Sequence, residues 1–180
     1  MSSTYLDRIE TVIGWGIEKG LVVTLDFHGS DLKSEFIYTF DSGETAYTHP
    51  TSAKRAADNE KFRAIWTQVA ERFKNHSENL LFEVINEPYF HMTAQDMNTL
   101  NSDIISIIRA TGYNNTTRNI IITGGTATSH EAPFQIESSI IANDAYLIAT
   151  FHYTNHLILQ VQVQILEMMK IGVQIQIKTP

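Results

Sequence analysis

The chain has 180 residues, 43% of them hydrophobic, with a formal net charge of -7, which suits one domain and argues against general affinity for nucleic acid or anionic membranes. No cysteine is present, which excludes disulfides and thiolate metal sites, and no apolar run reaches the roughly 18 residues that cross a bilayer. No secretion signal is visible among the opening residues, so we expect a protein that stays in the cell or a chain that begins downstream of its natural start.

A helix pattern followed by a short apolar run recurs along the chain. The first helix starts at Ser2 or Ser3 and ends at Gly20, and a later one starts after Thr93 with Asp96 completing a weak capping box. Other helical patterns lie near 62–73 and, shorter, near 135–142. The predicted strands cover residues 21–27, 80–85, 119–123 and 146–151.

This alternation predicts parallel strands joined by crossover helices, with both faces of the sheet covered. A doubly wound open sheet and a (β/α)8 barrel both fit that description. No strand runs into a GxGxxG motif, and the pair Gly124-Gly125 is too short for a phosphate loop. Polar residues do follow the strand ends, as in barrel enzymes, which favours the barrel. A full barrel needs about 250 residues, so we predict a partial (β/α)8 barrel.

The sharpest motif is Asn86-Glu87-Pro88, which directly follows a predicted buried strand. A partly desolvated carboxyl at a barrel mouth has a raised pKa, which suits Glu87 as a proton donor. Asn86 can donate a hydrogen bond to a sugar hydroxyl. From these three residues alone, an ordinary turn with a solvated glutamate is an equal alternative.

Two histidines share the predicted rim with Glu87. His28 follows the first strand, and His152 with Tyr153 follows the fourth. Such side chains hydrogen-bond sugar hydroxyls and orient carboxylates. A metal site is the rival interpretation, disfavoured because no HExxH or other close ligand spacing occurs, and no GxSxG motif supports serine catalysis.

These residues carry a family resemblance. YLDRIETVIGWGIEKGLVVTLDFHG, FRAIWTQVAERFKNHSENLLFEVINEPY, TRNIIITGG and ATFHY, in order within residues 4–153, resemble consecutive stretches of glycoside hydrolase family 5 endoglucanases. The resemblance implies a (β/α)8 barrel, strands three to six of which are the four predicted here. It further implies retaining cleavage of a β-1,4-linked glucan without a cofactor, and secretion.

The resemblance makes Glu87 the acid/base and Asn86, His28 and His152 substrate contacts, with Tyr153 beside them. Related β-mannanases and xylanases share these motifs, so the polymer stays open. The first two barrel strands and the glutamate that ends strand seven have no counterpart, which predicts weak or no activity. Alternation is taken to point Asp26 away from the side that His28 faces, so Asp26 is not expected to replace the missing nucleophile.

Residues 154–180 depart from the family. They alternate Gln with Val or Ile over part of their length, which is typical of a half-buried strand. Back-translated one base out of register, they can give YQPFDFTSSSSNFGNDEDWGTNPDKD, which continues FHY as family 5 cellulases do. We therefore expect that a single-base deletion after codon 153 produced this segment; a genuine divergent strand or helix is the alternative. A partial barrel also has open edges, which favour a homo-oligomer.

Overall fold

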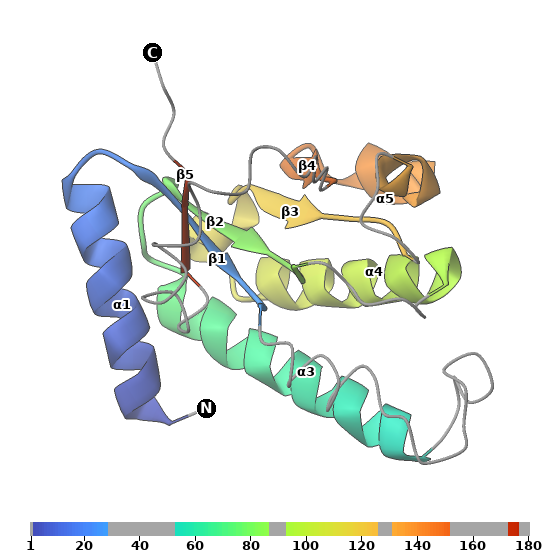
Figure 1. The fold of residues 1–180 in the computed structure, drawn as a ribbon, viewed down its shortest axis with the longest axis horizontal. Coiled ribbons are helices and arrows are strands. Elements are labelled where there is room, and N and C mark those ends of the chain that lie inside the picture. The colour runs from blue at the N-terminus through green and yellow to red at the C-terminus, as the bar shows by residue number, and fades with distance from the viewer. Residues whose placement is uncertain (1, 29–52, 87–92, 126–130, 152–172, 177–180) are drawn as a thin grey trace, which may run out of the picture.

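The computed structural model describes residues 2–28, 53–86, 93–125, 131–151 and 173–176. Its helices alternate with strands in chain order, with the labels of Figure 1. The helices are α1 (Ser3–Glu18), α3 (Ala53–Phe73), α4 (Ala94–Ala110) and α5 (Ser138–Asn143), with short 3-10 turns at η2 (Tyr113–Thr116) and η3 (Ala132–Gln135). The strands are β1 (Val22–Asp26), β2 (Leu80–Glu83), β3 (Ile120–Ile122), β4 (Leu147–Ala149) and β5 (Val173–Gln176).

The capping signals predicted from the sequence are present at α1 and α4. The Ser2 side chain accepts a hydrogen bond from the Tyr5 N–H at the start of α1, and Gly20 follows that helix with φ 75°. Thr93 and Asp96 form a complete capping box at the start of α4. No described helix is long and apolar enough to cross a membrane.

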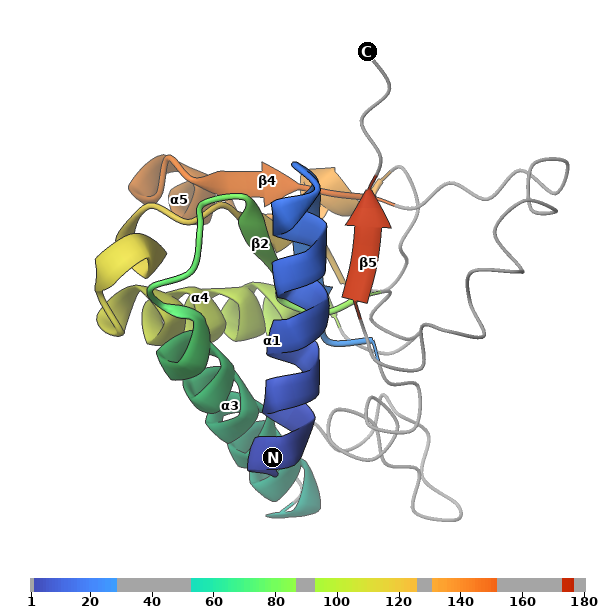
Figure 2. The same ribbon diagram turned by 90° about the vertical axis from the view of Figure 1, so that its left-hand side faces the viewer.

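The four predicted strands form one parallel arc in the order β4-β3-β2-β1. This confirms the prediction of parallel strands joined by crossover helices. Figure 1 shows α3 and α4 along one side of the sheet, with α1 beside β1. A fifth strand, β5, extends the sheet beyond β1 but runs antiparallel to it, with Val23 opposite Ile175. Figure 2 shows β5 next to α1 at this edge.

The core lies between the sheet and the helices. Strand residues of alternate register, such as Val23, Phe82 and Ile120, are fully buried against α1, α3 and α4. The intervening residues point to the opposite face, which in a closed barrel is the interior. One cross-strand row on that face consists of Asp26, Glu83, Ile121 and Ile148.

Candidate functional site at the carboxyl ends of the strands

The carboxyl ends of β1 and β2 lie side by side. The backbone N–H of Asn86 donates to the Phe27 carbonyl at 3.2 Å, so the chain stays paired past the last residue of each strand. The Asn86 side chain is buried, and its Oδ1 has no hydrogen-bond partner in the described part of the chain. His28 and Asn86 therefore leave neighbouring strands at the same edge, as the sequence predicted.

Helices on the core side fix the backbone at this edge. The Trp66 indole on α3 donates to the Val84 carbonyl at 3.1 Å, two residues before Asn86. Asn101 on α4 donates to the Thr123 carbonyl at 3.0 Å, just after β3. Trp66 itself is part of the core, since it is 2% exposed. These hydrogen bonds join the ends of β2 and β3 to the helices packed against them.

Asp26 joins this edge, contrary to the expectation that it points away from the side of His28. The His28 Nδ1 lies 3.1 Å from Asp26 Oδ2. The expectation was wrong because residues two apart in an extended strand point to the same face. The spacing Asp-x-His in the sequence therefore already indicated that the two side chains share a face. Asp26 is therefore a candidate site residue that the sequence prediction did not include.

The Asp26 carboxyl is deeply buried. Its side chain is 0% exposed, whereas that of His28 is 39% exposed. Its second oxygen, Oδ1, has no hydrogen-bond partner among the described residues. Burial raises the pKa of the Tyr5 hydroxyl at the start of α1, and the negative charge of Asp26 raises it further.

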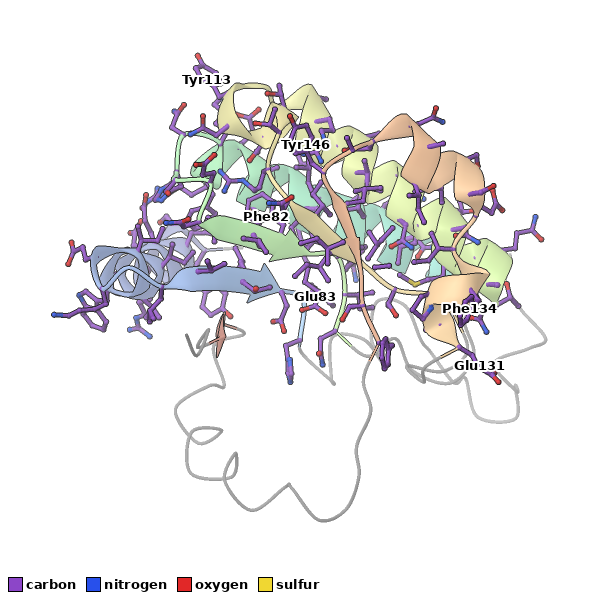
Figure 3. All side chains as sticks on the ribbon, turned by 90° about the horizontal axis from the view of Figure 1, so that it is seen from above. Phe82, Glu83, Tyr113, Glu131, Phe134 and Tyr146 are labelled. Atoms are coloured by element: carbon purple, nitrogen blue, oxygen red, sulfur yellow. The ribbon has the colours of Figure 1, made fainter. Side chains whose placement is uncertain are left out.

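Glu83 lies beside Asp26 in the cross-strand register and is also buried. Figure 3 shows Glu83 on the side of the sheet opposite the helices, whereas its neighbour Phe82 lies on the helix side. The same figure places Tyr113 and Tyr146 at the end where strands begin, and Phe134 and Glu131 at the end where they finish. Within the described ranges, no group of three His, Asp or Glu side chains could hold a metal ion.

Three predicted site residues, Glu87, His152 and Tyr153, lie outside the described residues. The positions next to them are described at the same edge. Asn86 immediately precedes Glu87, and Thr150, which precedes Phe151 and His152, donates its N–H to the Ile122 carbonyl at 2.9 Å. The Thr123 hydroxyl in turn donates to the Thr150 carbonyl at 3.2 Å, which ties the ends of β3 and β4 together.

Comparison with known sequences finds one family over most of the chain. The sequence model described as "Cellulase (glycosyl hydrolase family 5)" matches residues 1–157. Endoglucanase H of Acetivibrio thermocellus is 38% identical over 154 residues, which are 85% of this chain and 14% of that protein. Endoglucanase 1 of Ruminococcus albus is 28% identical over 164 residues, which are 82% of this chain and 37% of that protein.

Solved structures show the same likeness. A tri-modular endo-β-1,4-glucanase from Bacillus licheniformis, in complex with cellotetraose, superposes with a TM-score of 0.68 at 31% identity, over 85% of this chain and 27% of that one. A hyperthermophilic endo-β-1,4-glucanase in complex with substrate superposes with a TM-score of 0.67 at 25% identity, over 87% of this chain and 43% of that one. The chain thus spans less than half the length of each of these relatives.

Proposed function

The chain belongs to the cellulase family, glycosyl hydrolase family 5, as part of its (β/α)8 barrel, and from this premise we propose that it carries the acid/base half of an endo-β-1,4-glucanase site. The observation that carries the proposal is the family match over residues 1–157 together with the parallel strands whose carboxyl ends bring His28 and Asn86 together. Its substrate is a β-1,4-linked glucan, as the names of its relatives suggest.

Glu87 has the role of the proton donor in this proposal. It follows Asn86, whose backbone is held to β1 at a water-poor strand end. A carboxyl there protonates the oxygen of the leaving sugar and then deprotonates the water that completes the reaction. His28, Asn86, His152 and Tyr153 hydrogen-bond the sugar ring and orient it against Glu87.

Retaining hydrolysis also needs a nucleophilic carboxylate about 5–5.5 Å from the acid. Asp26 does not fit that role, because its side chain is 0% exposed and bonded to His28. Glu83, on the neighbouring strand β2, is also buried and therefore does not fit the role either. After His152 the sequence contains one acidic residue, Glu167, in a context unlike that of the family nucleophile. We therefore propose that this chain by itself does not hydrolyse glucan.

A shift in reading frame accounts for the missing nucleophile in this proposal. Residues 154–180 lie almost wholly beyond the family match, which ends at residue 157. Their described part, β5, runs antiparallel to β1, whereas every strand of a (β/α)8 barrel is parallel to its neighbours. The coding DNA around codon 153 tests this directly. A reading frame that continues with YQPFDF after one inserted base supports the proposal. A sequence whose existing frame over residues 154–180 matches a different protein family contradicts it.

Reducing sugar released from a soluble cellulose derivative tests the function. Three proteins are compared: the chain, its Glu87→Gln variant, and a version restored in frame and extended at both ends. We expect activity only from the extended version and its loss on Glu87→Gln there, by several orders of magnitude. Cleavage by the unextended chain that Glu87→Gln abolishes would mean that a second carboxylate completes the site.

A different polymer is the second candidate. One similar structure is named a xyloglucan-specific endo-β-1,4-glucanase, with a TM-score of 0.63 at 28% identity. Related β-mannanases and xylanases also share the NEP motif. The extended version should therefore be assayed on glucan, xyloglucan, mannan and xylan in parallel. The highest kcat/KM among them identifies the substrate.

A further inference from the structure

Asp26 and His28 form a part-buried carboxylate–imidazole pair at the carboxyl end of β1. The atoms in contact are Asp26 Oδ2 and His28 Nδ1, 3.1 Å apart. The carboxylate is enclosed and the ring is partly open, with side-chain exposures of 0% and 39%. The ring therefore stands between a buried anion and the edge of the sheet where Asn86 also lies.

The chemistry of the contact determines which ring nitrogen carries the proton. An ionised carboxylate only accepts hydrogen bonds, so Nδ1 must donate. In the neutral ring Nε2 then has the lone pair and is an acceptor. A histidine without such a partner has no comparable constraint on its tautomer.

Burial of the Asp26 carboxylate at this position is unfavourable for the stability of the fold. An enclosed carboxylate loses its hydration, and one of its oxygens, Oδ1, is not hydrogen-bonded by any described residue. The adjacent position of β2 is a second buried acid, Glu83. An apolar residue would fill the site at lower cost, so packing does not explain Asp26.

We infer that Asp26 is a positioning residue, which holds the His28 ring with its proton on Nδ1 so that Nε2 accepts a hydrogen bond from a glycan hydroxyl. This role rests on the proposed function, since it deepens the account of the same site. It is distinct from the role of a nucleophile, because Asp26 acts through His28 and does not touch the sugar.

A second pair in the molecule provides a matched control. His76 contacts Glu10 through the other nitrogen, with Nε2 lying 2.8 Å from Glu10 Oε1. The same reasoning predicts a proton on Nε2 of His76. The two histidines should therefore show opposite tautomers in one sample.

Long-range ¹H–¹⁵N correlation spectra distinguish the tautomers, since a protonated ring nitrogen resonates well upfield of an unprotonated one. The spectra are recorded on the 180-residue chain near pH 8.5, about two units above the ordinary histidine pKa. His28→Gln and His76→Gln assign the two signals. We expect Nδ1–H for His28 and Nε2–H for His76.

Substitutions then identify the cause. Asp26→Ala should change the His28 tautomer ratio by at least about tenfold and leave His76 unchanged. Glu10→Gln should affect His76 alone. If Asp26→Ala does not fold, Asp26→Asn keeps the shape and replaces a carboxylate that can only accept with an amide that can accept or donate, so the preference for Nδ1–H should weaken. An Nε2–H His28 in the unsubstituted chain, or a ratio that survives removal of Asp26, overturns the proposal.

Cellotetraose separates this inference from the proposed function. Added in excess, it should move the Nε2 signal of His28 and not that of His76, and Asp26→Asn should weaken the response. A His28 signal that stays in place overturns the glycan-facing role of Nε2. If the signal moves but the extended version releases no reducing sugar, only the proposed hydrolytic function fails.

Discussion

The guanidinium of Arg118 lies over the ring of Phe82, with Cζ 4.8 Å from the ring centroid. Arg118 is 1% exposed, and every N–H group of its guanidinium donates a hydrogen bond. They donate to the Asn115 side chain and to the carbonyls of Phe73, His76, Ser77 and Leu80. One cation thus caps the carboxyl end of α3 and joins it to the start of β2.

We expect Arg118→Met to lower the free energy of unfolding by about 3–5 kcal/mol, because several buried carbonyls lose their donors together. Burial lowers the pKa of Arg118 to about 10, with the charge of Arg109 contributing, so the group is still cationic at neutral pH. Urea denaturation followed by circular dichroism measures the change. The control is Arg72→Met, which removes surface ion pairs with Asp7 and Glu10 and should have little effect. Equal midpoints for the two variants would contradict this account.

The sequence predicted the parallel arc because its evidence is local. Apolar runs bounded by turns mark the strands, and the Thr93–Asp96 spacing marks the start of α4. It also indicated the shared edge of His28 and Asn86, since parallel strands end together. Arg118 was not recognised, because an isolated arginine in a polar stretch ordinarily lies in water and only tertiary packing encloses it.

Contacts between segments far apart in the chain could not be predicted from the sequence either, because they too depend on tertiary packing. His76 lies in a polar stretch of the sequence, yet it contacts Glu10 on α1 and packs edge-on against Phe73, with 5.1 Å between the ring centroids. The alternating segment that includes β5 was expected to form a strand, but neither its partner nor its antiparallel direction follows from alternation alone. The Asp26 error had another cause, a misapplied period of two.

Two glycines of α1 should respond oppositely to alanine. A Cβ at Gly16 would lie 2.6 Å from Val23 Cγ2, whereas one at Gly14 would meet nothing within 4 Å. Gly14→Ala should raise the free energy of unfolding by about 0.5–1 kcal/mol through helix propensity. Gly16→Ala should lower it by about 1–3 kcal/mol, because the valine on β1 cannot yield without moving the strand. Thermal unfolding of the pair tests this, and stabilisation by both would refute the close helix–strand contact.

Asp144 should make stability sensitive to acid. Burial favours its neutral form, but the hydrogen bond from Arg109, the Tyr146 N–H and the Arg109 charge outweigh burial and lower the pKa of the carboxyl. The folded state therefore binds the proton more weakly than the unfolded state. The resulting stability is present above about pH 4 and is lost as the pH falls through the lower folded pKa.

We expect Asp144→Asn to be less stable than the unsubstituted chain at pH 7, with the difference shrinking towards pH 2. Urea midpoints measured across this range show the trend. Asp103→Asn is the control, because Asp103 pairs with Arg63 in a more exposed position. A gap that widens in acid would contradict the direction of the pKa shift.

The outer edge of β4 should promote self-association. β4 is the last strand of the described sheet, and Ile148 and Phe151 beside this edge are 40% and 48% exposed. Unpaired strand edges with apolar side chains pair readily with another chain. We expect sedimentation velocity to show dimers or larger species, and Ile148→Lys to shift them towards monomer. Tyr113→Lys, at an exposed aromatic residue away from the edge, should leave the distribution unchanged. A monodisperse monomer before substitution would contradict the expectation.

The antiparallel pairing of β5 with β1 has a kinetic consequence. β5 occupies the side of β1 on which a barrel has its preceding parallel strand, from Val22 opposite Gln176 to Leu25 opposite Val173. A separately supplied amino-terminal piece could add its strand there only after β5 leaves. Complementation would then be a strand exchange whose rate, at high concentration of the added piece, becomes independent of that concentration. Detachment of the four residues of β5 from β1 would then limit the rate at which the barrel closes.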